Sequence, residues 1–321
     1  MRAARYERTG PAAEVIDVTD MDTPEPGSGE VRVRIAFSGV NPTDWKSRAG
    51  ATSGVSGEFQ IPNQDGSGVI DAVGEGVDPA RAGERVWIYF AARQRPWGTA
   101  AEYSVVPADC AVPLPDNASF ELGASIGIPA MTAHRCLFAD GPIEGKTVLV
   151  AGGAGAVGRC AIELGRWAGA GRIIATVSND EKARIAVDAG ADATVDYKAA
   201  DARKRVKDAG ADRIVELSLG QNLELDLAAA APHCAIASYA NEGDDPQIPV
   251  RSLMGPNIVL RFVLVYTMPR EAIDRAVADI TTALREGALT EPQLQRFELT
   301  ETAAAHDAVE AGATGKVLIA V

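Results

Sequence analysis

The sequence predicts an α/β protein of two domains, one rich in short strands and one built on a doubly wound parallel sheet. Three observations predict this class. The chain has 321 residues, more than one average domain, and 46% of them are hydrophobic, which supports a substantial core. Short strand-like segments dominate up to about residue 118, and strands alternate with helical patterns from about residue 119. A glycine-rich stretch follows the first of these later strands.

The first part of the chain carries the period-two pattern of half-buried strands. "VRVRIAF" at residues 31–37 alternates apolar residues with arginines. "GVIDAVG", "ERVWIYF" and "AAEYSVV" follow it, separated by Gly, Pro and Asp turns. Several short strands at this spacing indicate a barrel-like or sandwich-like sheet.

The second part alternates strands and helices, as βαβ units require. Apolar strands are expected near residues 147–151, 172–177, 193–195, 213–216, 234–238 and 258–265. "RIIATV" and "NIVLRFVLV" are apolar on both faces, which is typical of parallel strands covered by helices. Six strands complete a doubly wound sheet, so the two helices and final strand of the tail are expected to return to the first domain. The predicted domains are 1–118 with 268–321, and 119–267.

Composition narrows the class of protein. The net charge of −13 argues against a nucleic-acid partner, because such binding depends on Lys and Arg. No 18-residue apolar run predicts a membrane span, and the N-terminus lacks a signal-peptide pattern. Four widely spaced cysteines favour a reducing cytoplasm over a disulfide framework, and three scattered histidines offer little to a metal.

A glycine motif identifies the candidate ligand. Gly153, Gly155 and Gly158 have G-x-G-x-x-G spacing between the strand "TVLVA" and a helical pattern. Glycines let the backbone approach a pyrophosphate, which the N–H groups and dipole of the helix N-terminus then bind. We therefore expect a dinucleotide site here; the alternative is a tight turn without a ligand.

The residues after the second parallel strand bear on the choice of cofactor. An NAD site usually has Asp or Glu there, whereas this chain has Ser178 and Asn179, followed by Lys182 and Arg184. A small polar residue with nearby cations suits a 2′-phosphate, so the sequence favours NADPH. The alternative is that the two cations belong to a solvated helix face.

The chain resembles the medium-chain dehydrogenase/reductases, in particular the zeta-crystallin-type quinone oxidoreductases. The resemblance implies a GroES-like domain, a β-barrel-type fold built from both chain ends, around a central Rossmann domain with a cofactor in the cleft. It also implies a homodimer that pairs Rossmann edge strands near residues 258–265. The matching stretches, in the family's order, are "SGVNPTD", "DGSGVIDAVGEGV", "GTAAEYSVVPA", "GASIGIPAMTAHRCL", "GGAGAVG" and "ATGKVLIAV".

Three positions separate this chain from the zinc alcohol dehydrogenases of the wider family. The resemblance places Asn41 where those enzymes have a Cys ligand, and Gln64 and Asp65 where they have a His-Glu pair. The cysteine-rich lobe of a structural zinc is also missing. Because amides are poor zinc ligands, we expect no metal. Without a Lewis acid, alcohol oxidation is disfavoured and reduction of a quinone or an α,β-unsaturated carbonyl is favoured.

Candidate catalytic residues are Asn41, Gln64 and Asp65. Asn41 is expected to donate a hydrogen bond near the nicotinamide or the substrate; alternatively, all three are polar turn residues. No proton donor stands out, and His134, Tyr266 and solvent remain open. The cofactor-binding residues that the motif and the resemblance imply are Asn41, Lys46, Gly153, Ala154, Gly155, Ala156, Val157, Gly158, Ser178, Lys182, Tyr197, Ser238, Tyr239, Phe262, Val263 and Lys316.

The leading hypothesis is a zinc-independent, cytoplasmic oxidoreductase that transfers hydride from NADPH to a quinone. An enone or enal reductase on the same scaffold is the enzymatic alternative. A non-catalytic NADPH-binding or structural protein is the alternative of another class.

Overall fold

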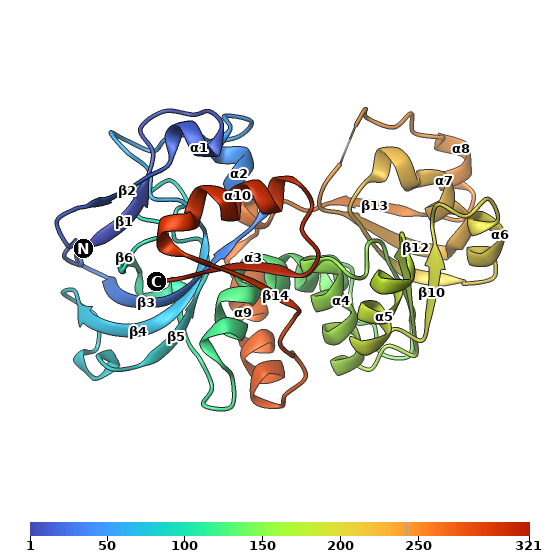
Figure 1. Ribbon diagram of the computed structural model, residues 1–321. Coiled ribbons are helices and arrows are strands. Elements are labelled where there is room, and N and C mark those ends of the chain that lie inside the picture. Colours follow the sequence, from blue (N-terminus) through green and yellow to red (C-terminus); the bar gives the residue numbers. More distant parts are fainter. Residues whose placement is uncertain (242) are drawn as a thin grey trace. The chain divides into compact units, whose positions relative to one another are not determined.

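Residues 1–241 and 243–321 are described by the computed structural model, and contacts divide them into two units. Unit 1 contains Met1–Ile128 and Glu291–Val321, and unit 2 contains Pro129–Thr290. Both chain termini therefore lie in unit 1 (Figure 1). The sequence predicts domain boundaries after residues 118 and 267. These boundaries differ from those of the two units partly because helix α9 (Arg270–Arg285) packs on α4 (Ala156–Trp167) and so belongs to unit 2.

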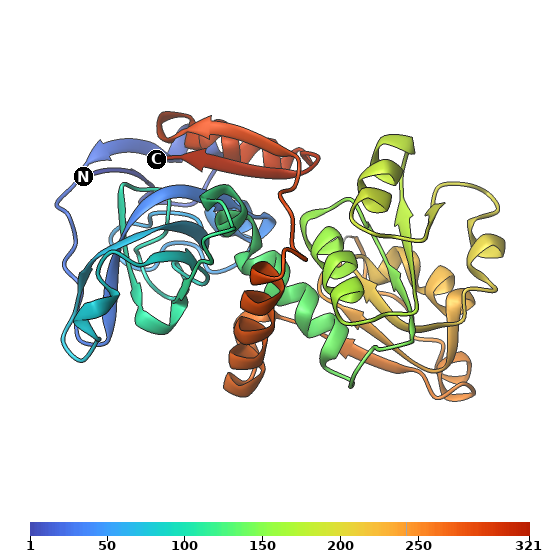
Figure 2. The ribbon, with the colours of Figure 1, turned by 90° about the horizontal axis from the view of Figure 1, so that it is seen from below.

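Unit 1 is built on a seven-stranded sheet whose central strand is β3 (Glu30–Val40). This strand pairs antiparallel with β4 (Asp65–Val73), β6 (Tyr103–Pro107) and β15 (Lys316–Ala320). Strand β15 in turn pairs in parallel with β14 (Leu294–Glu298), drawn in red in Figure 2. The remaining strands of this unit are β5 (Arg85–Ile88), β7 (Ala111–Pro113) and the separate pair β1 (Arg2–Arg5) and β2 (Asp17–Asp20).

The end of the tail, Glu291–Val321, thus returns to unit 1, whereas the expected first helix of the tail, α9, belongs to unit 2, and β14 was not expected. Helix α10 (Thr302–Glu310) packs on α2 (Pro42–Arg48) and on β15. The other helical elements of unit 1 are α1 (Ala12–Val15), η1 (Pro79–Arg81), η2 (Ala108–Cys110), η4 (Leu299–Glu301) and the first part of α3 (Phe120–Phe138).

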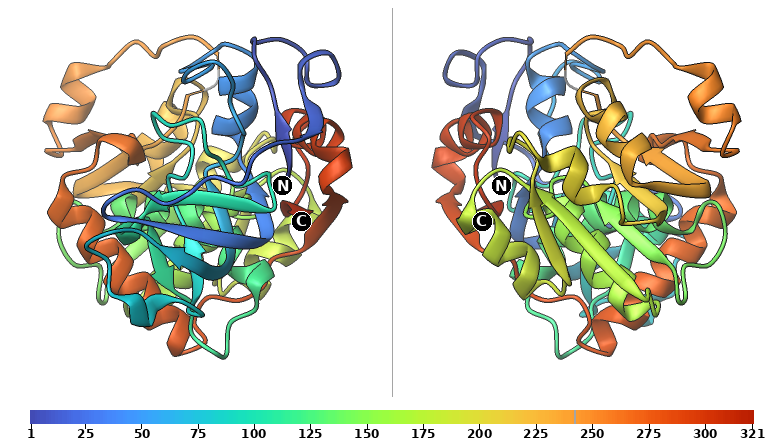
Figure 3. Two further views of the ribbon diagram at one scale, coloured as in Figure 1. Left: turned by 90° about the vertical axis from the view of Figure 1, so that its left-hand side faces the viewer. Right: turned by 90° about the vertical axis from the view of Figure 1, so that its right-hand side faces the viewer.

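Unit 2 is built on six parallel strands in the order β10-β9-β8-β11-β12-β13 (Figure 3). This is the 3-2-1-4-5-6 order of a Rossmann sheet, so the predicted fold class is confirmed. The strands are β8 (Thr147–Val150), β9 (Arg172–Val177), β10 (Ala193–Asp196), β11 (Ala211–Glu216), β12 (Ala230–Ser238) and β13 (Val259–Phe262). The other helices are α5 (Asp180–Asp188), α6 (Ala202–Val206), α7 (Leu219–Ala229), α8 (Val250–Met254) and η3 (Val265–Thr267).

Burial follows the apolar pattern of these strands. Leu149, Ile214 and Ile236, from three neighbouring strands, are completely buried in one hydrophobic cluster. Parallel strands are covered by helices on both faces, which explains their continuous apolar runs. The edge strand β13 is shorter than expected, since it ends at Phe262. No helix in the described ranges is long and apolar enough to cross a membrane.

Candidate active site

The glycine loop joins β8 to α4 in unit 2. Gly155 is the N-cap of α4, which begins at Ala156. A Cβ at Gly153 would lie 2.6 Å from the Cβ of Ala175, and a Cβ at Gly158 would lie 2.2 Å from the carbonyl oxygen of Gly152. Both distances are too short for real contacts, so helix and strand pack this closely only because these residues are glycines.

The same loop fits the pyrophosphate of a dinucleotide. The first N–H groups of α4, which starts with Ala156, Val157 and Gly158, have no intrahelical acceptors, and the dipole of the helix is positive at this end. At Gly155 the nearest atom to an added Cβ is the oxygen of Gly152, at 3.3 Å, so a side chain there would occupy otherwise open space. The expected cofactor residues 153–158 therefore lie at a helix start whose free N–H groups and dipole suit an anion.

The expected 2′-phosphate residues gather at the carboxyl end of β9. Ser178 follows this strand directly and is half-buried. The side-chain oxygen of Asn179 accepts the backbone N–H of Lys182 at 2.9 Å, which places Lys182 in the first turn of α5. Within the described chain the Lys182 ammonium has no ion pair. The backbone N–H of Tyr197 donates to the carbonyl oxygen of Val177 at 3.1 Å, which places Tyr197 beside the last residue of β9. The tyrosine is 43% exposed.

The four remaining Rossmann candidates line one cavity of about 750 Å³ in unit 2. Ser238 and Phe262 are paired residues at the ends of β12 and β13, and the N–H of Val263 donates to the Ser238 carbonyl at 2.8 Å. Most of the lining is apolar, and Tyr239 adds an aromatic ring. Because ligands of doubly wound sheets bind beyond the carboxyl ends of strands, this cavity suits part of a dinucleotide or its acceptor.

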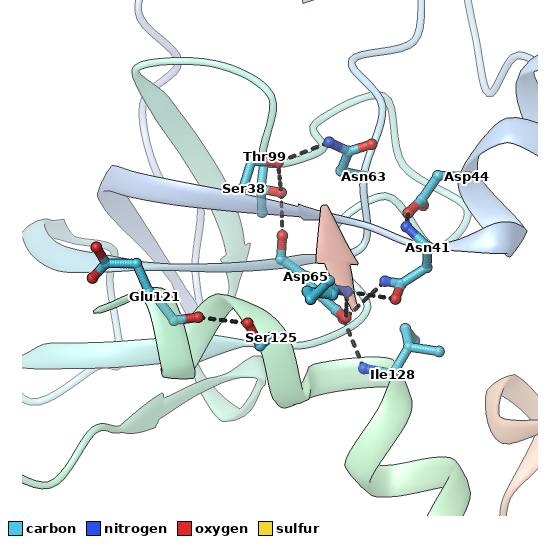
Figure 4. Close-up of polar contacts among 10 residues, drawn as sticks. Ser38, Asn41, Asp44, Asn63, Asp65, Thr99, Glu121, Ser125 and Ile128 are labelled. Atoms are coloured by element: carbon cyan, nitrogen blue, oxygen red, sulfur yellow. Dashed lines mark hydrogen bonds and ion pairs between the residues drawn. The ribbon is translucent and has the colours of Figure 1, made fainter. Parts of the chain in front are cut away.

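A buried polar cluster in unit 1 unites three residues that are distant in sequence (Figure 4). Asn41 follows β3, Asp65 begins β4 and Lys316 begins β15, and β3 lies between the other two strands. The Nδ2 atom of Asn41 donates to Asp65 Oδ2 at 2.7 Å. Lys316 Nζ donates to Asn41 Oδ1 at 2.7 Å. The ammonium also lies 3.6 Å from Asp65 Oδ2, and all three residues are at most 2% exposed.

Asp65 is held by further bonds from unit 1. The backbone N–H of Ile128 donates to its Oδ1 at 2.8 Å, and the Thr99 hydroxyl donates to its carbonyl oxygen. Ser38 Oγ lies 2.7 Å from Thr99 Oγ1 and accepts Asn63 Nδ2 at 2.9 Å (Figure 4). Burial raises the pKa of Asp65, whereas the Lys316 charge and the hydrogen bond from Asn41 lower it.

Asp44 completes the cluster from the first turn of α2. Its carboxylate accepts the backbone N–H of Asn41 at 2.7 Å, which holds the residue before the helix. Burial, followed by the nearby charge of Asp65, raises the pKa of Asp44 to about 8. The Asn-x-x-Asp spacing is close to a capping box and could have identified this residue from the sequence. No local pattern identifies Ser38, Asn63 and Thr99, because they come from three separate segments.

Other predicted residues have different surroundings. Gln64 precedes Asp65, and its side-chain oxygen is buried without a partner in the described chain. Lys46 lies on α2, with its ammonium 5.6 Å from the Trp45 ring centroid. His134 Nε2 lies 2.8 Å from Asp279 Oδ2, and burial lowers the pKa of the imidazole. The His134 side chain therefore has a packing and hydrogen-bonding role within unit 2.

The donor set of the unit 1 cluster does not fit zinc. Zinc in proteins takes thiolate, imidazole or carboxylate ligands. Here Asn41 supplies an amide, and the ammonium of Lys316, which has no lone pair, already faces Asp65. In the described ranges no three or more His, Cys, Asp and Glu residues are grouped to hold a metal ion.

Comparison with known proteins agrees with this architecture. Residues 27–116 match the family described as alcohol dehydrogenase GroES-like domain, and residues 156–282 match the family described as zinc-binding dehydrogenase. A quinone oxidoreductase of Pseudomonas aeruginosa is 30% identical over 310 residues, covering 94% of each chain. Quinone oxidoreductase of Mus musculus is 28% identical over 330 residues, covering 99% of this chain and 97% of the relative.

Solved structures extend this similarity to the fold. A mycobacterial protein complexed with NADPH superposes with a TM-score of 0.86 at 28% identity, and an NAD-dependent alcohol dehydrogenase with 0.90 at 30% identity. Both matches cover all of both chains. A GroES-like sheet combined with a Rossmann sheet defines a class of nicotinamide-dependent oxidoreductases. The chain belongs to the medium-chain dehydrogenase/reductase superfamily, in its zeta-crystallin-like quinone oxidoreductase group.

Proposed function

We propose that this protein is a zinc-independent reductase that uses NADPH to reduce a quinone. The observation that carries the proposal is the ammonium of Lys316 against Asn41 and Asp65. These two residues correspond to zinc-ligand positions in the alcohol dehydrogenases of the superfamily. The Lys316 ammonium contacts both Asn41 and Asp65, and an ammonium cannot polarise a carbonyl as a Lewis acid does. The acceptor must therefore itself be electron-poor.

Bound NADPH supplies the hydride. The helix start at residues 153–158 binds its pyrophosphate, and Ser178 and Lys182 bind the 2′-phosphate. The relative solved with NADPH supports this choice, whereas another structural relative is NAD-dependent. The residue that distinguishes the two coenzymes in this chain is Lys182, whose ammonium has no ion pair in the described chain to neutralise it.

Asn41 supplies the polar contact to the acceptor. An amide nitrogen has two N–H donors, and one is used by Asp65. The second donates to a carbonyl oxygen of the quinone, where negative charge develops as hydride arrives. A donor in a buried environment stabilises such charge better than water does. A solvent proton then completes the hydroquinone.

We further propose that the protein is a cytoplasmic homodimer formed through β13. This strand is the edge of the parallel sheet, and Phe262 and Leu264 at its end are 73% and 59% exposed. An unpaired edge with exposed apolar residues favours pairing with a second copy. All four cysteines are free thiols, which suits a reducing compartment.

The test is turnover by purified protein treated with a chelator. We expect NADPH oxidation with benzoquinone or naphthoquinone that is unaffected by metal removal. Faster turnover of a cyclic enone than of either quinone would identify an enone reductase instead. Tight NADPH binding without turnover of any acceptor would indicate a non-catalytic protein and overturn the proposal.

A further inference from the structure

The Asn41 carboxamide lies between a hydrogen-bond acceptor and a donor of opposite charge. Its nitrogen faces the Asp65 carboxylate and its oxygen faces the Lys316 ammonium, each at 2.7 Å. If the amide turned over, its oxygen would face the carboxylate and its N–H groups would face the ammonium. Both contacts would then be repulsive in a buried site, so only one of the two orientations is compatible with this pair.

The pair itself has little freedom to move. Asp65 Oδ1 accepts the N–H of Ile128 at 2.8 Å, and a Cβ at Gly127 would lie only 2.3 Å from the same oxygen. Lys316 lies where β15 begins its pairing with β3, and it is 2% exposed. The carboxylate is therefore held by backbone, and the ammonium is held by burial and by its contacts with Asn41 and Asp65.

This arrangement leaves one N–H of the amide without a partner in the described chain. Its direction is set by the two bonds already made. Turning the amide over would exchange the remaining N–H for a C=O, which repels the carbonyl oxygen of an acceptor. The orientation of Asn41 therefore decides whether a developing negative charge meets a donor.

We propose that Lys316 and Asp65 are positioning residues: together they fix the Asn41 carboxamide with its remaining N–H toward the acceptor. This inference rests on the proposed function and changes the roles expected from the sequence. Lys316 acts through Asn41 instead of binding the cofactor, and Asp65 acts through Asn41 instead of being a catalytic residue itself.

Three variants separate orientation from charge. Lys316→Met leaves a buried carboxylate without its counter-ion, and Asp65→Asn leaves a buried ammonium without its carboxylate. The double variant removes both charges, and the new amide at position 65 can donate to Asn41 Oδ1 once the Asn41 amide has turned over. The double variant therefore restores buried hydrogen bonds with the carboxamide reversed.

The variants are compared by urea unfolding and by kcat with NADPH and benzoquinone. We expect a lower unfolding midpoint in each single variant and recovery of most of the loss in the double variant. We expect kcat to fall by about 10- to 100-fold in both variants that carry Asp65→Asn, because Asn41 Nδ2 loses the carboxylate that holds it, and to fall by less in Lys316→Met, where Asp65 alone still holds the amide. Lys207→Met, an exposed lysine next to α6, is the matched control and should change neither quantity.

A purely structural role predicts that kcat recovers together with the midpoint in the double variant, and that result would overturn the inference. Wild-type kcat in Lys316→Met would do so as well. If the wild-type protein reduces no quinone or enone, the proposed function fails. The positioning of Asn41 is then tested separately, by the NMR signal of its side-chain amide. This signal, assigned by its loss in Asn41→Asp, should move in both single variants; an unchanged signal refutes the positioning.

Discussion

Lys182→Ala is expected to weaken the binding of NADPH and leave that of NADH nearly unchanged. Lys182 lies in the first turn of α5, after the strand end that carries Ser178. Its ammonium forms no salt bridge with any described residue, so it is available to a phosphate. NADH lacks the 2′-phosphate, and its binding should not depend on this charge.

The size of the effect follows from the exposure of the side chain. A hydrogen bond to a charged group contributes about 1.5–3 kcal/mol, and solvent screening favours the lower part of this range for a half-buried lysine. A loss of about 1.5–2 kcal/mol corresponds to about 10- to 30-fold weaker binding. Because the interaction is partly screened, the factor should become larger at low ionic strength.

The assay is calorimetric titration of both coenzymes at two salt concentrations. Lys204→Ala, on α6 of the same unit, is the matched control for a change of one surface charge. Equal weakening of NADPH and NADH by Lys182→Ala would mean that the side chain supports the fold of the site instead of the phosphate. No weakening of either would remove the structural reason for preferring NADPH.

Three further predictions concern stability and assembly. Gly158→Ala should destabilise the protein by about 1–3 kcal/mol in urea unfolding, because its Cβ would lie 2.2 Å from the oxygen of Gly152; an unchanged midpoint would contradict the packing of the loop. Burial and the neighbouring Glu216 raise the pKa of Asp226, so the folded state keeps a proton that the unfolded state loses above about pH 4. Asp226→Asn should therefore become more stable than the wild type as pH rises, by at most about 1.4 kcal/mol per pH unit, and a pH-independent difference in melting curves would refute this. Phe262→Glu should convert a dimer formed through β13 into monomers, which light scattering would detect, and a wild-type mass would place the interface elsewhere.

Much of the fold could be predicted from local pattern. The glycine spacing between "TVLVA" and a helical segment predicted the dinucleotide loop, and the structure gives Gly153 and Gly158 the close contacts that this loop requires. All six parallel strands were expected near their observed positions, because strands buried on both faces leave continuous apolar runs. Strand β14 was missed, since "LQRFE" is mostly exposed or half-buried and lacks such a run.

The candidate site was predictable only in part. Resemblance alone brought Asn41, Gln64 and Asp65 together, and the structure shows contact between Asn41 and Asp65. Lys316 was assigned to the cofactor, whereas its ammonium lies buried on these two residues. A lysine at the start of an apolar strand signals nothing about its partner, because the partner is about 250 residues away in the chain.

Sequence alone therefore determined the βαβ order, the glycine loop and the return of the final strand, because periodicity and turn residues express short-range sterics and burial. Tertiary structure decided the orientation of the Asn41 amide and the counter-ion of Asp65. These depend on which strands become neighbours of β3, and strand pairing is set by long-range packing that no local pattern contains.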